Sequence, residues 1–201
     1  FSPFTGARQR IYMSATLGNG GDLERIVGRK QIHKLPVPDQ WSNRTVGRRF
    51  FCFPEASLND ADTTHFMKAA VQVSNRAVFI TPSVRRLNEV EATLTDLEGY
   101  EIVKASQIEA SKDAFCTKEK AVLLLSNRYD GIDFPDDECR LLVIDGLPKA
   151  SNLQENFLIT KLGLSGLYQS RLLTRITQAF GRTTRGTSDY SVVLVIGDEI
   201  V

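Results

Sequence analysis

Residues 121–133 read Ala-Val-Leu-Leu-Leu-Ser-Asn-Arg-Tyr-Asp-Gly-Ile-Asp, an apolar run followed directly by a polar loop. An uninterrupted aliphatic run such as Ala121–Leu125 is typical of a strand that is buried on both faces of a parallel sheet. A polar loop between buried strands is ordinary, but Gly131 followed by Asp133 is less so. The aspartate can bind a ribose hydroxyl or orient an arginine, or it is a plain turn residue, and this stretch alone does not choose.

Similar apolar runs recur along the chain, and helical patterns separate them. Strands are expected over residues 48–53, 77–80, 101–103, 121–125, 141–144 and 191–196. Helices are expected from Asp60 or Asp62 to about Ser74, and over 84–97, 154–163 and 167–184. This alternation predicts an α/β fold with three layers, in which a mostly parallel sheet is flanked by helices. Ligands of such sheets bind at the carboxyl ends of the strands.

The first 47 residues follow a different pattern. A short strand is expected over Ile11–Met13, followed by Ser14-Ala15-Thr16 and a glycine-rich loop. Asp22 is a good N-cap for a short helix over residues 23–27. Residues 33–47 contain two prolines and are predicted to be an irregular connector. We therefore divide the chain into residues 1–47 and an α/β domain over 48–201.

Composition restricts the classes of function. With 201 residues the chain can form one α/β domain with a substantial core. The net charge of +1 provides no overall attraction to nucleic acid, so any such binding must depend on local patches. No apolar run approaches the length of a membrane span, and no signal peptide is visible. The chain begins Phe1-Ser2-Pro3 without an initiator methionine, so we expect a fragment of a longer protein.

The cysteines give no sign of a disulfide framework or a metal site. Cys52, Cys116 and Cys139 are widely spaced and odd in number, and only two histidines accompany them. We interpret them as buried apolar residues of a protein in a reducing compartment, and expect a cytoplasmic or nucleoid-associated location.

Residues 178–185 read Gln-Ala-Phe-Gly-Arg-Thr-Thr-Arg, near the predicted end of the last helix. On a helix, Arg182 and Arg185 would point the same way because they are three positions apart. The planar, always charged fork of arginine suits phosphate oxygens, so the pair predicts an arginine-finger site for a nucleoside triphosphate. Gly181 has no side chain and would let a ligand come close. The alternative is a solvated basic helix face.

Thr81-Pro82-Ser83 follows the apolar run that ends at Ile80, with two hydroxyls just before a predicted helix. Such a site can bind a phosphate through free backbone N–H groups and hydroxyls. Arg85 and Arg86 occupy the first helical turn, where the helix dipole disfavours cations, which suggests an anionic partner. The alternative is an ordinary N-cap with exposed arginines.

Taken in order, these stretches resemble the motifs of superfamily 2 helicases. Ser14-Ala15-Thr16 resembles motif III, which closes the first RecA-like domain, while residues 78–83 resemble motif IV and 126–133 motif V. Residues 178–185 match the Gln-x-x-Gly-Arg-x-x-Arg pattern of motif VI. Gly131-Ile132-Asp133-Phe134, residues 143–148 and Asp189-Tyr190 look closest to the XPD-like and DinG-like DNA helicases. Residues 1–47 would then end the first RecA-like domain, and 48–201 would form the second, with a P-loop NTPase-like fold.

The resemblance implies a role for each matching residue. Arg185 would be the arginine finger on the γ-phosphate, Arg182 would lie beside it, and Gln178 would contact the nucleotide or the attacking water. Gly131, Asp133 and Gly181 would belong to the ATP site, and the first two would couple it to nucleic acid. The residues expected near the nucleic-acid backbone are Thr81, Ser83, Arg85, Ser126, Asn127 and Arg128. Ser14 and Thr16 would link hydrolysis to strand movement.

The sequence lacks two elements of a complete ATP site. It has no Gly-Lys-Ser/Thr loop and no Asp-Glu pair in the right order relative to motif III. ATP and Mg²⁺ would therefore be bound mainly by the N-terminal RecA-like domain of the same protein, no metal ligand is expected here, and the isolated chain would be inactive. The leading interpretation is the C-terminal lobe of an ATP-dependent helicase acting on nucleic acid, with DNA expected. The alternatives are a duplex translocase that does not unwind, an inactive RecA-like scaffold or nucleic-acid-binding module, and an unrelated nucleotide-binding or sugar-transfer domain.

Overall fold

The computed structural model describes residues 2–13, 22–28, 32–36, 47–128, 131–148, 157, 161 and 165–197. The chain divides into two compact units, Phe1–Ser42 and Asn43–Val201. The described residues of the first unit form two short helices, α1 (Ser2–Gly6) and α2 (Asp22–Val27), and the second of these confirms the helix expected after Asp22.

The strand predicted over Ile11–Met13 is wrong. These residues are irregular, and the side chains of Ile11 and Met13 are 81% and 88% exposed. A strand needs a neighbour to pair with its backbone groups, and the described residues of this unit contain no other strand.

The second unit is built on a six-stranded sheet in which all neighbouring strands are parallel. Its strands are β1 (Arg48–Cys52), β2 (Arg76–Thr81), β3 (Glu101–Lys104), β4 (Ala121–Ser126), β5 (Leu141–Asp145) and β6 (Tyr190–Ile196). Their order across the sheet is β1-β6-β5-β2-β4-β3. Each strand overlaps a predicted one, and the continuous apolar runs of β2, β4 and β5 are stable because both faces of the sheet are covered there.

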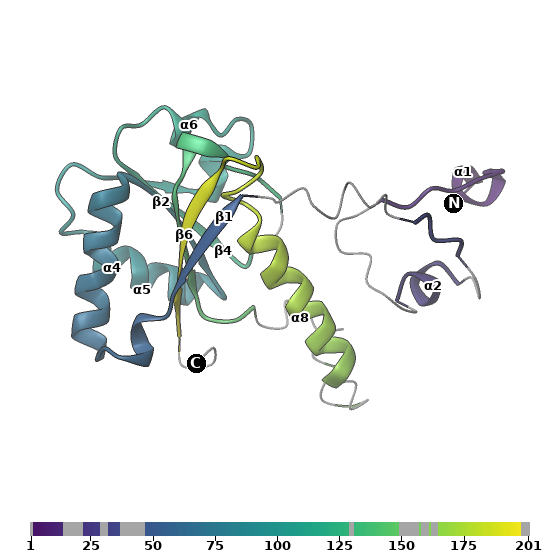
Figure 1. Ribbon diagram of the computed structural model, residues 1–201, viewed down its shortest axis with the longest axis horizontal. Coiled ribbons are helices and arrows are strands. Elements are labelled where there is room, and N and C mark those ends of the chain that lie inside the picture. Colours follow the sequence, from purple (N-terminus) through teal and green to yellow (C-terminus); the bar gives the residue numbers. More distant parts are fainter. Residues whose placement is uncertain are drawn as a thin grey trace. The chain divides into compact units, whose positions relative to one another are not determined.

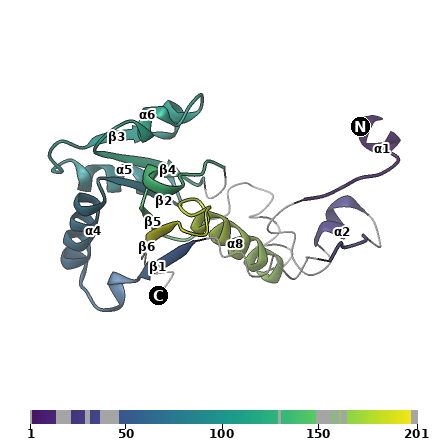
Figure 2. The same cartoon turned by 45° about the horizontal axis from the view of Figure 1, so that its top comes forward.

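Helices cover both faces of this sheet (Figures 1 and 2). On one face α4 (Asp60–Ser74) and α5 (Val84–Leu94) bury Met67, Val71, Leu87 and Val90 against the sheet. On the other face lie α6 (Asp113–Cys116), the loop around Phe134 and the end of α8 (Ser165–Phe180). Short 3₁₀ turns occur at Pro54–Ala56, Ala105–Ile108 and Asp136–Glu138. The predicted α/β fold, with a parallel sheet between two helical layers, is confirmed.

Helix boundaries differ from the expected ones in places that matter for the site. Asn59, not Asp60 or Asp62, caps α4, since its side chain accepts a hydrogen bond from the Asp62 N–H at 2.9 Å. The last helix ends at Phe180, four residues before its predicted end at 184, so both arginines of motif VI lie beyond it. The helix predicted over 154–163 falls almost wholly outside the described residues. No helix within the described ranges is long and apolar enough to cross a membrane.

Candidate functional site

The turn that follows α8 separates the two arginines that the sequence placed on one helix face. The backbone N–H groups of Gly181 and Arg182 still bond to the carbonyls of Gln178 and Ala179, both at 3.1 Å, after which the chain leaves the helix. Arg182 is buried at 2% exposure, whereas the side chain of Arg185 is 53% exposed. The expectation that the two arginines share a helix face is therefore wrong, because the helix ends at Phe180, before either of them.

The loop after β4 returns to this turn and joins it. The backbone N–H of Phe134 donates to the carbonyl of Arg182 at 2.7 Å, and Arg185 Nη2 donates to Asp133 Oδ1 at 2.5 Å. Of the interpretations open for Asp133, the structure supports the one in which it orients an arginine. Gly131 has φ of +117°, which a residue with a side chain rarely adopts, and Arg182 Nη2 lies 3.9 Å from where its Cβ would be. We call Gly131, Asp133, Arg182 and Arg185 the arginine cluster.

Asp189 holds the arginine cluster to the sheet. Its buried carboxylate accepts hydrogen bonds from the backbone N–H groups of Arg185 at 3.0 Å, Asp136 at 3.2 Å and Tyr190 at 2.8 Å. Its fourth partner is the guanidinium of Arg140, just before β5. Burial acts to raise the pKa of Asp189, but these hydrogen bonds outweigh it and lower that pKa. One carboxylate therefore ties the motif VI turn to both strands beside it.

The arginine cluster lies toward the amino ends of the strands. Residues 182–189 lead into β6, and Arg140 leads into β5. At the start of β2, Arg76 Nε donates to the carbonyl of Glu138 at 2.8 Å. The chain has therefore returned to the amino ends of the strands before β5 begins. This part of the site therefore lies away from the carboxyl ends, because the turn after α8 leads directly into the start of β6.

The residues predicted to contact nucleic acid do lie at the carboxyl ends, where β2 and β4 finish side by side. Thr81 and Ser126 are partners in the sheet register, and the N–H of Asn127 donates to the carbonyl of Thr81 at 2.7 Å. Thr81 is fully buried, and its hydroxyl donates to the carbonyl of Ser83 at 3.1 Å. Ser83 caps α5 by accepting a hydrogen bond from the N–H of Arg86 at 3.2 Å. We call Thr81–Arg85 and Ser126–Arg128 the carboxyl-end loops.

The basic side chains of the carboxyl-end loops reach into solvent. The side chain of Arg85 is 91% exposed and contacts Glu89 at 3.2 Å. Arg128 is 45% exposed and pairs with Glu109 at 3.0 Å. Both can exchange these partners for a phosphate, because exposed ion pairs contribute little stability. Unlike the arginine cluster, these loops thus carry guanidinium groups whose ion pairs are exposed and weak.

Arg86, beside Arg85, is directed elsewhere. It donates from Nε to Asp145 Oδ1 at 2.8 Å, and Asp145 is buried at the end of β5. Burial raises the pKa of this aspartate, against the opposing effect of the guanidinium. The pair anchors α5 to the sheet, so Arg86 has a structural role.

Comparison with known proteins now identifies the family. Residues 66–200, about two thirds of the chain, match the model of the family described as "Helicase C-terminal domain". The chain belongs to this helicase family.

A solved XPD helicase structure has a similar fold, with a TM-score of 0.62 at 15% sequence identity. That match covers 93% of this chain and 38% of the XPD helicase chain. No curated protein matches this chain significantly. The resemblance to a second RecA-like helicase domain, and the RecA-like fold, are confirmed.

The remaining predicted residues are Ser14, Thr16, Gln178 and Gly181. Ser14 and Thr16 lie outside the described residues. Gln178 is half-buried in the last turn of α8. A Cβ on Gly181 would meet only ordinary contacts, the nearest being the carbonyl oxygen of Gln178 at 3.4 Å. Space inside the domain therefore does not explain this glycine.

Sequence reasoning missed two residues that complete the motif VI region, Asp189 and Arg49. Asp189 appeared only as part of a family resemblance, and nothing local marks it as a buried hydrogen-bond acceptor. Arg49 of β1 donates from Nε to the hydroxyl of Thr184 at 2.8 Å. A signal for Arg49 was present in the strand Arg-Arg-Phe-Phe-Cys, where alternation places it on the same face as Phe51.

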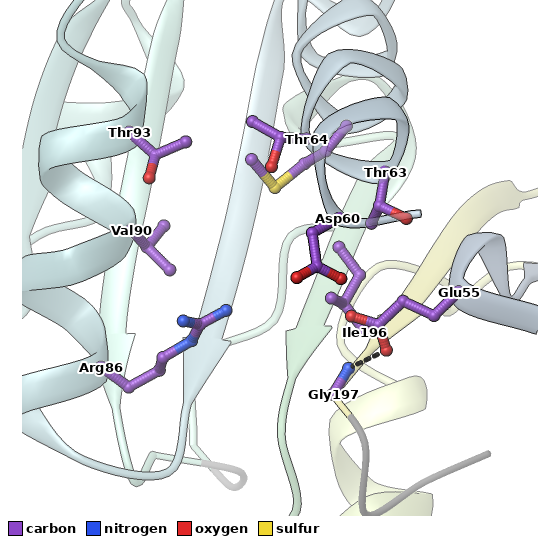
Figure 3. Close-up of a pocket in the computed structure, with 10 residues that line it drawn as sticks. Glu55, Asp60, Thr63, Thr64, Arg86, Val90, Thr93, Ile196 and Gly197 are labelled. Atoms are coloured by element: carbon purple, nitrogen blue, oxygen red, sulfur yellow. Dashed lines mark hydrogen bonds between the residues drawn. The ribbon is translucent and has the colours of Figure 1, made fainter. Parts of the chain in front are cut away.

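A separate cavity of about 380 Å³ lies near the carboxyl end of β6 (Figure 3). Arg86 and Val90 of α5 face Asp60 and Thr64 of α4 across it, and Glu55 accepts a hydrogen bond from the N–H of Gly197 at 2.7 Å. None of the predicted site residues lines this cavity. Its lining combines two carboxylates with one guanidinium, so its charge selects no class of ligand.

Proposed function

We propose that this domain is the C-terminal lobe of an ATP-dependent nucleic-acid helicase, in which the arginine cluster acts on ATP bound by another lobe. The observation that carries the proposal is the junction of motifs V and VI. Asp133 holds the guanidinium of Arg185, and a backbone hydrogen bond joins Phe134 to Arg182. A partly exposed guanidinium fixed by a carboxylate is prepared to meet a phosphate presented from outside the domain.

Arg185 is the residue assigned to the γ-phosphate. Charge that develops on the transferred phosphoryl group in the transition state is stabilised by a positioned guanidinium. Arg182 is buried beneath, at Gly131, so we assign it the support of this turn and a contact with phosphate only if the turn rearranges. Gln178, Gly131 and Gly181 complete the surface that would face the nucleotide.

Among the described ranges, no three His, Cys, Asp or Glu side chains gather as a metal-binding group. We assign Mg²⁺, and the loop that holds the phosphates, to an N-terminal RecA-like lobe of the same protein, because this sequence has neither a Gly-Lys-Ser/Thr loop nor an Asp-Glu pair in the right order relative to motif III. This domain would supply positive charge and position it.

The carboxyl-end loops are assigned to the nucleic acid, with DNA as the expected form. Arg85 and Arg128 are exposed and can contact backbone phosphates, while the half-buried Ser126, Asn127 and Ser83 offer hydrogen bonds at the same edge. Thr81 is buried, so its role is to shape the loop. The match to the family of helicase C-terminal domains supports a motor that works on nucleic acid.

The proposal is tested by Arg185→Ala in the full-length protein. Turnover of ATP should fall by about 10³ to 10⁵, the range for arginine fingers, while the affinity for nucleic acid changes little. Arg185→Lys should not restore turnover, because lysine lacks the planar fork.

Arg48→Ala provides the matched control, since Arg48 is an exposed arginine of β1 outside the motifs. A steady-state ATPase assay together with thermal unfolding separates loss of catalysis from loss of folding. Equal and small effects of the two substitutions in folded protein would refute the assignment, and the inactive scaffold would become the better account.

A further inference from the structure

Arg49 enters the motif VI region from a different element. It lies in the edge strand β1, where alternate residues face opposite sides of the sheet, so Arg49 and Phe51 share a face. The ring of Phe51 contacts that of Phe180 with centroids 4.9 Å apart, at the last residue of α8. This contact places Arg49 beside the turn that carries both motif arginines.

The guanidinium of Arg49 is fixed by that turn. Its Nε donates to the hydroxyl of Thr184 at 2.8 Å, and its Nη2 lies 3.9 Å from the position of a Cβ on Gly181. Thr184 and Gly181 both belong to the motif VI stretch, on either side of the buried Arg182. A side chain from β1 therefore lies against the backbone that presents Arg185.

The charge of Arg49 has no counter-ion within the part of the chain that the structure describes. Among the described residues no ion pair includes it, although it is half-buried. Burial and, second, the positive charge of Arg185 both lower the pKa of Arg49. The aspartate of the arginine cluster already pairs with Arg185. A half-buried region with more guanidinium than carboxylate is suited to an anion.

We propose that Arg49 binds an oxygen of the same triphosphate whose terminal phosphate Arg185 meets, so that β1 contributes to the nucleotide site. This inference rests on the proposed function. A contact made with bound ATP before reaction would lower the affinity for ATP when lost, whereas Arg185 acts mainly on turnover. A structural role is the competing account, because a cation at the C-terminus of α8 is favoured by the helix dipole.

The experiment compares Arg49→Gln with Arg48→Gln in the full-length protein. The two arginines are neighbours in β1, but the Arg49 side chain donates to Thr184 of the motif VI turn, whereas Arg48 is exposed and donates its backbone N–H to the carbonyl of Asp189. We expect Arg49→Gln to raise KM for ATP, and Kd for a non-hydrolysable ATP analogue, by roughly 10- to 100-fold, the range for a hydrogen bond to a charged group. Arg48→Gln should leave both constants unchanged, and Arg49→Lys should restore part of the affinity.

Two further variants distinguish the ways in which the inference can fail. Arg185→Gln should lower kcat; if it does so while Arg49→Gln leaves KM and Kd unchanged, the inference fails and the proposed function stands. If neither variant has an effect in folded protein, both fail. Thr184→Val removes only the hydroxyl that holds Arg49. If it lowers Tm as much as Arg49→Gln does, with KM unaltered in both, Arg49 is structural and the inference is overturned.

Discussion

In the arginine cluster the functional side chains are held by one another, whereas in the carboxyl-end loops the backbone is fixed and the basic side chains are free to exchange partners. Asp133 holds Arg185, and Asp189 gathers three backbone N–H groups and Arg140. In the loops, Thr81 and Asn127 fix the chain, but Arg85 and Arg128 have only exposed partners. A site for transition-state charge benefits from fixed geometry, while a track for a moving polymer benefits from contacts that are easily broken.

The two regions also lie at opposite ends of the strands of one sheet. The carboxyl-end loops follow β2 and β4, whereas the motif VI turn leads into β6. The layer of strands between them provides a packed connection. Substitutions in only one of the two regions are therefore the best tests of whether the arginine cluster and the carboxyl-end loops have separate functions.

The largest effect is expected from Asp189→Asn, which should destabilise the fold by about 3 kcal/mol, as removal of one partner from a buried ion pair does. The change keeps the shape of the side chain and removes the charge that Arg140 and three backbone N–H groups contact. Chemical denaturation of the 201-residue chain measures this cost.

Asp137→Asn is the matched control for that substitution. Asp137 contacts the same Arg140 at 3.1 Å, but its side chain is 96% exposed. It should cost less than about 1 kcal/mol, the usual limit for an exposed pair. Equal costs for the two variants would mean that Asp189 does not hold the cluster.

The stability that Asp189 provides should depend on pH with a definite sign. Because its folded pKa is lowered, its contribution is complete above the unfolded carboxyl pKa of about 4 and is lost as the pH falls through the lower folded value. The difference in stability between wild type and Asp189→Asn should therefore shrink on acidification below about pH 4. A difference that grows there would contradict the shift.

Some of this organisation follows from the sequence and some does not. The central strands are recognisable because β2, β4 and β5 each contain at least four consecutive apolar residues, and such runs have few other stable environments. The helix α8 ends at Phe180 and not at the predicted residue 184, because Gly181 and the two threonines that follow have low helix propensity. Pairing of Arg185 with Asp133 joins positions 52 residues apart, so no local pattern distinguishes it from a plain turn aspartate.

An intermediate effect is expected from Asp133→Asn. The pair with Arg185 is partly exposed, so its loss should cost less than about 1 kcal/mol of stability. ATP turnover should nevertheless fall by roughly 10- to 100-fold, because the guanidinium loses its orientation. Glu109→Gln, which removes the corresponding partner of Arg128 in the other region, should leave turnover without nucleic acid unchanged. If turnover falls only in step with stability, Asp133 has no orienting role.

The smallest effects are expected in the carboxyl-end loops. Arg85→Gln and Arg128→Gln should each weaken nucleic-acid binding a few-fold and reduce the log–log salt slope by about 0.7 on single strands or 0.9 on duplex. Fluorescence anisotropy at several salt concentrations measures both. Lys118→Gln is the control, since Lys118 pairs with Glu101 away from these loops. An unchanged slope in both arginine variants would remove them from the nucleic-acid track.

The separation of ATP turnover from nucleic-acid binding is tested most directly by measuring Arg185→Ala and Arg128→Ala side by side in the full-length protein. The two readouts are ATP turnover without nucleic acid and affinity for nucleic acid without ATP. We predict that Arg185→Ala loses turnover and keeps affinity, while Arg128→Ala keeps turnover and loses affinity. If each substitution impaired both readouts equally in folded protein, the arginine cluster and the carboxyl-end loops would not be separate sites.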